Sequence, residues 1–353
     1  MSTVQEAKAA LDHIIAIGRA HWYKPIHIAE VLYHSRTSGH FNAANLEEFR
    51  NASRRWRDDI STRLVGRRST SSMRYQDDVW NESAMPPRLL KVLDRENKDT
   101  GGAVERYIYL NFEHNISLIG SLMAYVQAAT KETFDLEDLL ARFEDEPGLK
   151  RSVDKAYEIV VYALFATLVS HLNATVTLNV NPGKLDLLRE FEDFARMILG
   201  VTPERPQITQ DARLYRVGVT NAADRGLDMW ANFGPAVQVK HITLKADVVE
   251  GAANEIKADK MVLVCRQAEA RLIESVLKQA GLGDKIRGII TEDNLVAWYG
   301  KCLHGRYSDE LSEELLSRLV EEFAVEFPHE GEFVTFYTER KYDEIEPSVP
   351  WQW

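Results

Sequence analysis

The segment that most constrains the fold is residues 223–244, because its pattern predicts a β-hairpin. Residues 227–230 suit a strand, since they combine apolar and aromatic side chains with a single acid. Residues 232–235, Asn-Phe-Gly-Pro, are turn formers, and residues 236–244 then give a run rich in β-branched and apolar side chains. We therefore expect two antiparallel strands that meet at this turn.

The predicted hairpin brings three polar side chains together. Gln238 and Lys240 are two residues apart on the second strand, so they share a face of the sheet. If the hairpin closes at residues 232–235, Asp228 lies at a similar height on the neighbouring strand. An acid, an amide oxygen and an ammonium group are then expected to converge on one point.

This group of side chains suits the hydrolysis of a phosphodiester with a hard divalent cation. Mg²⁺ prefers oxygen ligands and keeps several waters, so it needs few protein ligands. We expect Asp228 to be the charged ligand, Gln238 a neutral ligand and the carbonyl of Val239 a third. Lys240 cannot bind a metal, but it can orient or help deprotonate the attacking water and offset charge on the phosphate. The alternative is a surface hairpin whose polar side chains are simply solvated.

Length and composition limit the classes of protein to consider. A chain of 353 residues, 45% of them hydrophobic, is long enough for two domains of a globular protein. Its two cysteines, Cys265 and Cys302, have no zinc-finger or disulfide-framework spacing, so we expect reduced thiols. The N-terminus lacks a signal-peptide pattern, and no run approaches the length of a membrane span. A cytoplasmic location without a membrane partner is therefore expected.

The net charge of −11 argues against non-specific coating of DNA, yet one segment is strongly basic. Residues 50–74 contain eight arginines and two acids, and their GRRSTSS stretch adds hydroxyl donors. Such side chains bind phosphates, and an arginine can bind a guanine edge with two parallel hydrogen bonds. The alternative is pairing with Asp58, Asp59, Asp77 and Asp78 on a solvated face. The candidate DNA contacts are Arg54, Arg55, Arg57, Arg63, Arg67, Arg68, Ser69, Thr70, Ser71, Ser72 and Arg74.

Residues 1–147 are predicted to form a mainly α-helical domain that recognises DNA. Pro25 suits the first turn of one helix, another helix should begin near Leu46, and Asp135 suits the N-cap of a third. We expect residues 96–102 to form a polar loop. Helices next to a basic segment are compatible with a helix-turn-helix, and a plain helical packing unit is the alternative.

Residues 148–353 are predicted to form an α/β domain around the hairpin. A long apolar helix over residues 151–172 precedes the strands and contains the acid Glu158. Desolvating a charge is costly, so Glu158 needs a partner, and a pair with Lys155 or a place on the helix surface is the alternative to a metal. Strands are expected near residues 174–180, 214–220, 261–265, 286–290 and 333–337, and helices near 183–199, 246–258, 268–280, 294–303 and 312–327.

The spacing from Asp228 to the sequence Gln238-Val239-Lys240 resembles the PD-(D/E)xK nuclease motif, with glutamine in place of the usual second acid. The resemblance implies a central mixed sheet flanked by helices, in the order helix, three strands, helix, strand. It also implies that an acid on the preceding helix, here Glu158, can complete the metal site. The glutamine leaves one fewer negative charge for the metal.

Three segments together resemble the HaeII-type restriction endonucleases, namely WYKPIHIAEVLYH at 22–34, GRRSTSSMRYQDD at 66–78 and DRGLDMWANFGPAVQVKH at 224–241. The resemblance spans nearly the whole chain. It implies a Type II enzyme that uses Mg²⁺ to cut both strands of double-stranded DNA at a short palindrome, purine-GCGC-pyrimidine. It further implies a homodimer, and a companion DNA methyltransferase that acts on the same site without a stable complex.

Two other functions are compatible with the same residues. A nuclease of this fold could recognise damaged or branched DNA, and it would leave a plasmid uncut or reduced to a smear. A non-catalytic DNA-binding regulator would use the basic N-terminal helices alone and would not cleave DNA in Mg²⁺. Cleavage of a plasmid separates the three interpretations.

Overall fold

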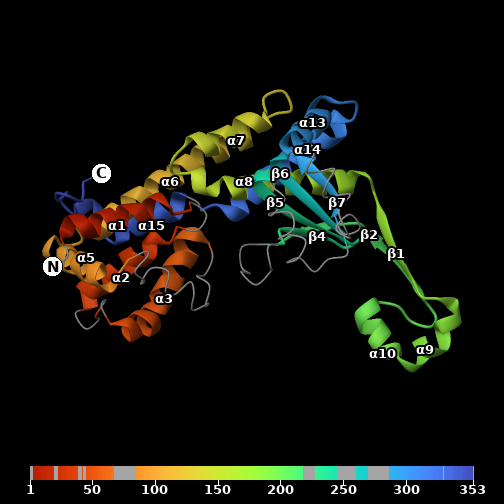
Figure 1. Cartoon of the computed structure of the whole chain (residues 1–353), viewed down its shortest axis with the longest axis horizontal. Coiled ribbons are helices and arrows are strands. Elements are labelled where there is room, and N and C mark those ends of the chain that lie inside the picture. Colours follow the sequence, from red (N-terminus) through yellow and green to blue (C-terminus); the bar gives the residue numbers. More distant parts are fainter. Residues whose placement is uncertain are drawn as a thin grey trace. The chain divides into compact units, whose positions relative to one another are not determined.

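The computed structural model describes residues 3–19, 23–38, 42, 45–66, 85–217, 227–244, 260–268, 286–328 and 330–352 (Figure 1). The chain forms two compact units, Met1–Ala156 with Leu319–Trp353 in the first and Tyr157–Arg318 in the second. The boundaries fall inside two long helices, α8 (Val153–His171) and α14 (Ser308–Glu326). The first unit thus contains both ends of the chain, whereas the sequence suggested one boundary after residue 147. The division of recognition and catalysis between 1–147 and 148–353 stays a prediction.

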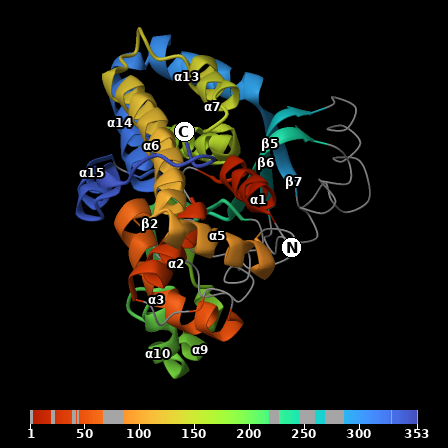
Figure 2. The same cartoon turned by 90° about the vertical axis from the view of Figure 1, so that its left-hand side faces the viewer.

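The first unit is α-helical in its described residues, as predicted for the N-terminal region. Its elements are α1 (Val4–Ala16), α2 (Pro25–Ser38), α3 (Leu46–Val65), α5 (Pro87–Asp99), α6 (Ala103–Ala128), α7 (Leu136–Asp145), α15 (Glu330–Glu339), and the 3₁₀ turns η1 (Lys150–Ser152) and η4 (Tyr342–Glu344). Thr3 and Asp135 cap α1 and α7 through their side chains, and Pro25 and Pro87 open α2 and α5. Helix α2 packs against α1, α3, α5 and α6 (Figure 2), so it is buried on nearly every side.

Residues 96–102 do not form the expected polar loop, because α5 continues through Asp99. Asn97 is buried, and its side-chain oxygen accepts the backbone N–H of Glu105 at 3.2 Å. This bond ties the end of α5 to the start of α6. The prediction was wrong because the polar side chains of this segment, such as Asn97, find partners on another helix, which the local sequence does not show.

The predicted strand at residues 333–337 is wrong, since this segment lies in helix α15. Its aromatic and β-branched run, Phe-Val-Thr-Phe-Tyr, favours a strand locally. Phe333 and Phe336 are both buried in the core of the first unit, whereas Val334 between them is exposed. This spacing is helical, and packing against α6 outweighs the local preference.

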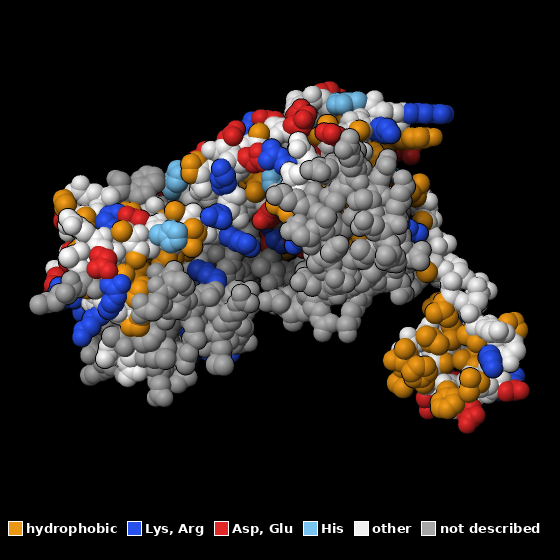
Figure 3. Space-filling model, in the orientation of Figure 1, with side chains coloured by type: hydrophobic (Ala, Val, Ile, Leu, Met, Phe, Trp, Pro, Cys, Tyr) orange, Lys and Arg blue, Asp and Glu red, His pale blue; other side chains and the backbone are white. Residues whose placement is uncertain are grey.

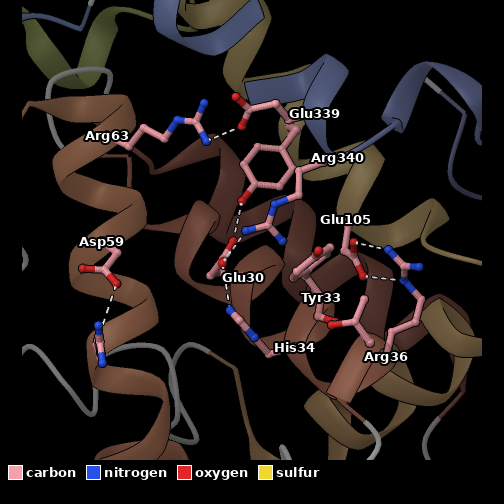
Figure 4. A network of polar contacts seen from close by, with 12 residues as sticks. Glu30, Tyr33, His34, Arg36, Asp59, Arg63, Glu105, Glu339 and Arg340 are labelled. Carbon is pink, nitrogen blue, oxygen red and sulfur yellow. Dashed lines mark hydrogen bonds and ion pairs between the residues drawn. The ribbon is translucent and has the colours of Figure 1, made fainter. Parts of the chain in front are cut away.

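Two buried carboxylates connect the helices of the first unit (Figure 4). Glu30 Oε1 on α2 lies 3.0 Å from Nε2 of His34 and accepts a hydrogen bond from Arg340, just after α15, at 2.9 Å. Glu105 on α6 accepts two hydrogen bonds from Arg36, at 3.0 and 2.9 Å. Each buried acid therefore has a cationic partner within the unit, which offsets the cost of removing it from water.

The second unit is built on five strands, β3 (Leu214–Arg216), β4 (Met229–Ala231), β5 (Pro235–Leu244), β6 (Lys260–Ala268) and β7 (Ile286–Thr291). They lie in this order in one sheet, antiparallel from β3 to β5 and parallel from β5 to β7. Figure 1 labels β4 to β7 of this sheet. Helix α13 (Glu292–His304) packs on β6 and β7, and the hydroxyl of Tyr157 on α8 donates to the Cys265 carbonyl on β6 at 2.9 Å. A mixed sheet flanked by helices, together with a helical N-terminal region, confirms the predicted fold class.

The predicted hairpin is present as β4 and β5. Its register pairs Met229 with Val237. The turn contains Gly234, whose φ of 115° suits glycine and few other residues. The parallel strands that follow need crossover connections. The helices predicted for them, at residues 246–258 and 268–280, lie outside the described residues.

The strand predicted near residues 174–180 is present, but it lies in a second sheet and not in the central one. Strands β1 (Thr175–Asn179) and β2 (Gln207–Asp211) pair with each other in antiparallel fashion and not with the central sheet. Between them lie η2 (Pro182–Lys184), α9 (Leu185–Glu190), α10 (Glu192–Phe194) and the π-helical turn η3 (Ala195–Leu199). The segment β2 escaped prediction because Gln-Ile-Thr-Gln-Asp has one apolar residue and no hydrophobic alternation. We call residues 175–211 the arm.

The cysteines behave as expected, and no membrane span is found. Cys265 and Cys302 are free and buried. Burial raises the pKa of the Cys265 thiol to about 11 and also raises the pKa of Cys302. Both thiols therefore stay protonated near neutral pH, where they are poor nucleophiles. Within the part of the chain that the structure describes, no helix combines the length and apolarity needed to cross a bilayer.

Candidate active site

Asp228 is fixed against the second strand of the hairpin. It lies one residue before β4, and its Oδ2 accepts the backbone N–H of Val239 at 2.7 Å. Its own N–H donates to the carbonyl of Val237 at 3.2 Å, and its carbonyl accepts the N–H of Val217 at 2.8 Å. These three bonds set both the position and the orientation of the carboxylate.

Gln238 lies in the interior of the sheet, on β5 between β4 and β6. The register between β4 and β5 pairs Met229 with Val237. Extended by one residue, it sets Asp228 opposite Gln238. On the other side of β5, Leu263 of β6 pairs with Gln238. Gln238 is 3% exposed, and no hydrogen-bond donor among the described residues reaches its Oε1. An unsatisfied buried polar atom costs about 1–3 kcal/mol. Such an atom calls for an explanation, and a bound ion is one.

Lys240 lies two residues beyond Gln238 on β5, so strand alternation puts both side chains on one face. Lys240 is half-buried. The regular β5–β6 register breaks between Lys240 and Thr243, and irregularities of this kind are common beside active sites. The structure therefore brings the Asp228 carboxylate against the backbone of Val239. Lys240 follows Val239 on β5.

Glu158 has a protein partner that the sequence did not indicate. Its Oε1 lies 3.2 Å from the guanidinium of Arg216 at the end of β3, and the two side chains are 8% and 7% exposed. The alternative had been a pair with Lys155. A single arginine at the end of a short strand carries no sequence pattern that marks it as the partner of a distant acid. Arg216 satisfies one oxygen of Glu158. The role of Glu158 as a metal ligand stays a prediction.

The oxygen atoms at the hairpin suit a hard divalent cation. Among the described residues, no three His, Cys, Asp or Glu side chains gather into a metal cluster. A site here must therefore combine the carboxylate of Asp228 with neutral oxygens, as the substitution of glutamine for the usual acid implies. The buried Oε1 of Gln238 is such an oxygen, on the residue that the β4–β5 register, extended by one position, sets opposite Asp228. Mg²⁺ needs one or two carboxylates and keeps several waters, so this set fits the ion.

Comparison with known proteins identifies the family. The family model described as HaeII restriction endonuclease matches residues 7–342. The chain belongs to this family. It is 45% identical over 345 residues to the Type II restriction enzyme HaeII of Haemophilus aegyptius, covering 97% of this chain and 98% of that protein. It is 46% identical over 342 residues to the Type II restriction enzyme NgoBI of Neisseria gonorrhoeae, covering 96% and 97%. No solved structure matches the chain.

Membership of the HaeII restriction endonuclease family confirms the resemblance drawn from three sequence segments. It also confirms the predicted class of enzyme, a Type II restriction endonuclease, which is a site-specific deoxyribonuclease. DNA is therefore the substrate of the class. The family match does not by itself assign roles to residues, so the hairpin assignments rest on the geometry above.

The basic segment of this HaeII-family chain is partly described, on α3. Arg54 lies 4.0 Å from Asp58, and Arg55 lies 3.8 Å from Asp59. Both are i,i+4 pairs with exposed arginines, which contribute little to stability. Pairing of arginines with nearby aspartates on an exposed face is the alternative to DNA contact. Because such pairs are weak, these arginines can also leave the aspartates and bind a phosphate.

The other two candidate arginines on α3 have different surroundings. Arg63 donates to Glu339 at 2.6 Å (Figure 4), and this hydrogen bond raises the pKa of Arg63. Arg57 is 1% exposed and donates to Ser53 at 3.1 Å, so it is part of the packed interior. DNA contact by these arginines stays a prediction. The remaining candidates, Arg67, Arg68, Ser69, Thr70, Ser71, Ser72 and Arg74, lie outside the described residues.

Proposed function

We propose that this chain cuts both strands of double-stranded DNA at a short palindrome and that it needs Mg²⁺ to do so. The observation that carries the proposal is the buried Gln238 Oε1, which lacks a donor among the described residues. Gln238 follows Val237, which pairs with Met229, and the Asp228 carboxylate is fixed on the backbone of Val239. A hairpin with solvated side chains would leave that oxygen in water. Its burial therefore favours a cation site over an inert hairpin.

Each residue of the hairpin has a distinct role in this proposal. Asp228 and Gln238 hold the ion with the carbonyl of Val239, and Glu158 is a further candidate ligand. When bound, Mg²⁺ supplies Lewis-acid stabilisation of the charge that develops on the scissile phosphate. Lys240 orients the attacking water or takes up its proton, and its positive charge offsets charge on the phosphate.

The proposed partners follow from the family resemblance. The proposed site is purine-GCGC-pyrimidine, whose guanines suit readout by arginine. A palindrome has two-fold symmetry, so a homodimer would present one catalytic hairpin to each strand. Residues 1–147 would recognise the DNA and residues 148–353 would cut it. A companion DNA methyltransferase would protect the same site without a stable complex, in the cytoplasm of the host.

Digestion of a sequenced plasmid by the purified chain tests the proposal. In Mg²⁺ we expect discrete fragments whose ends all map to one short palindrome, and in EDTA we expect none. A smear, or cuts at unrelated sequences, would indicate a nuclease that recognises DNA structure or damage. Intact DNA in Mg²⁺ despite measurable binding would indicate a regulator and overturn the proposal.

The variant Asp228→Ala tests the metal assignment within the same experiment. It removes the charged ligand of the proposed site, so cleavage should fall below detection. Binding to the palindrome, measured in Ca²⁺, should remain, since the carboxylate is proposed to hold the cation and not the DNA. Cleavage at a near wild-type rate would show that the metal lies elsewhere.

A further inference from the structure

The far end of the arm exposes a large apolar surface. Six side chains between α9 and η3 are 37–76% exposed, and apolar side chains cover one face of this part of the molecule in Figure 3. They are Leu187, Phe191, Phe194, Met197, Ile198 and Leu199. We call these six residues the apolar tip.

The arm has little core of its own. Its buried cluster consists of Leu188, Ala195 and Val201, and all but one residue of each strand β1 and β2 is exposed. A two-stranded ribbon in water is marginally stable at best. A hollow of about 510 Å³ at the tip is lined mainly by apolar side chains, among them Leu187 and Phe191. An arm built in this way gains stability when another apolar surface covers it.

The exposed area is that of a protein–protein contact. If a fully exposed large apolar side chain presents roughly 200 Å², the apolar tip presents on the order of 700 Å². Monomeric proteins rarely expose an apolar patch beyond a few hundred Å². A stable interface buries about 800 Å² on each partner. One apolar tip set against an identical one therefore approaches the area that a stable dimer needs.

The charges around the apolar tip favour a protein over DNA as the partner. Residues 184–196 include three basic and four acidic side chains. Arg189 pairs with Asp186 at 2.6 Å, and Arg196 pairs with Glu192. A surface without an excess of cations has little attraction for phosphates. Mixed charges around an apolar centre can instead complement a second copy of themselves across a two-fold axis.

We infer that the apolar tip binds the apolar tip of a second copy of this chain and forms a two-fold dimer contact. The inference deepens the proposed function, because it rests on the expectation that two copies act on one palindrome. It adds the surface through which they meet. That surface belongs to the arm, which is separate in the sheet topology from the strands of the candidate active site.

Sedimentation velocity over a range of protein concentrations tests the contact. The variant Met197→Lys/Ile198→Lys places charge on the two most exposed residues of the apolar tip. It should raise the dimer dissociation constant at least about tenfold, since two charges would have to be buried where two apolar side chains are in the wild type. The matched control is Val334→Lys, which changes an exposed valine of the first unit and should leave the dimer intact. On plasmid DNA, the tip variant should give nicked circles in place of double-strand cuts.

Cross-linking gives a second test that needs no destabilising change. The variant Met197→Cys adds one exposed thiol to a chain whose own two thiols are buried. A short bis-maleimide should join two copies of this variant covalently, and it should not join copies of Val334→Cys. This readout remains informative if the lysine variant fails to fold.

The outcomes separate this inference from the proposed function. A wild-type protein that is monomeric on its own and on DNA, or a dimer that persists in the lysine variant and does not cross-link through Met197→Cys, would overturn the inference. Double-strand cleavage by such a protein would leave the proposed function standing. A dimer that depends on the apolar tip but cuts no DNA would overturn the proposed function and support the contact.

Discussion

Two buried acids of the first unit and one buried amide of the second differ in their surroundings. In the first unit, Glu105 accepts hydrogen bonds from Arg36 and from the hydroxyl of Tyr342, and Glu30 accepts one from Arg340. In the second unit, Gln238 is also buried, but its Oε1 lacks a donor among the described residues. The first arrangement satisfies charges inside the protein, as stability requires. The surroundings of Gln238 leave its Oε1 as an acceptor for a ligand or ion from solution.

The contrast leads to different expectations for replacing Glu105 and Gln238. A side chain whose partners all come from the protein should affect the free energy of unfolding when it is replaced. Replacing a side chain whose partner must come from solution should lower activity. An apolar replacement also removes the unsatisfied buried atom, so the free energy of unfolding should not fall.

After Asp228, Lys240 should be the hairpin position with the largest effect on rate. Replacing Lys240 with Ala should lower the cleavage rate by about 10²–10⁴-fold, the usual contribution of a positioned proton-transfer group. Affinity for DNA and stability should change little, because the ammonium group acts on the reacting water and phosphate. Single-turnover cleavage and DNA titration in Ca²⁺ measure the two quantities separately, with Lys341→Ala in the first unit as the control. Equal losses of rate and affinity would make Lys240 a binding residue.

Glu105 should have the largest effect on stability. The variant Glu105→Leu leaves Arg36 and Tyr342 without their buried acceptor, which should lower the free energy of unfolding by about 3–5 kcal/mol. Urea unfolding measures the loss, and the matched control Glu339→Leu removes an exposed acid that pairs with Arg63 and should change little. Folded Glu105→Leu should cleave DNA at the wild-type rate. A stability equal to that of wild type would remove the physical basis of the contrast.

Gln238→Leu should give smaller changes of opposite sign. Leucine is similar in size to glutamine and has no acceptor to leave unsatisfied, so stability should be unchanged or higher by about 1 kcal/mol. Loss of one neutral ligand should lower cleavage at limiting Mg²⁺ by about 10–100-fold. The measurements are urea unfolding and cleavage over a series of Mg²⁺ concentrations. A large loss of stability would mean that Gln238 has a partner inside the protein after all.

The hairpin could be predicted from sequence because its signals are local. The turn formers at 232–235 and the two-residue spacing of Gln238 and Lys240 lie within one short segment, and strand geometry fixes the rest. The long apolar helix before the sheet was predictable for the same reason. Neither required any knowledge of how distant parts of the chain pack.

The features that escaped prediction depend on distant contacts. Arg216 reaches Glu158 across 58 positions of sequence, and nothing local pairs them. Residues 333–337 have strand propensity and become helical because Phe333 and Phe336 are buried on one side. The missing donor at Gln238 is likewise a property of the packed sheet. Sequence could name the candidate ligand, and the structure supplied the physical reason to consider it one.

Arg55 and Arg57 repeat the contrast within one helix, with the smallest expected effects. The side chain of Arg55 is 87% exposed, whereas Arg57 is 1% exposed and bonded to Ser53. If α3 contacts DNA, Arg55→Ala should lower the slope of log affinity against log salt by about one unit without loss of stability. Arg57→Ala should lower stability through lost packing and leave that slope unchanged. An unchanged slope for Arg55→Ala would remove this residue from the DNA surface. A lowered slope for Arg57→Ala would show that its side chain leaves the interior when DNA binds.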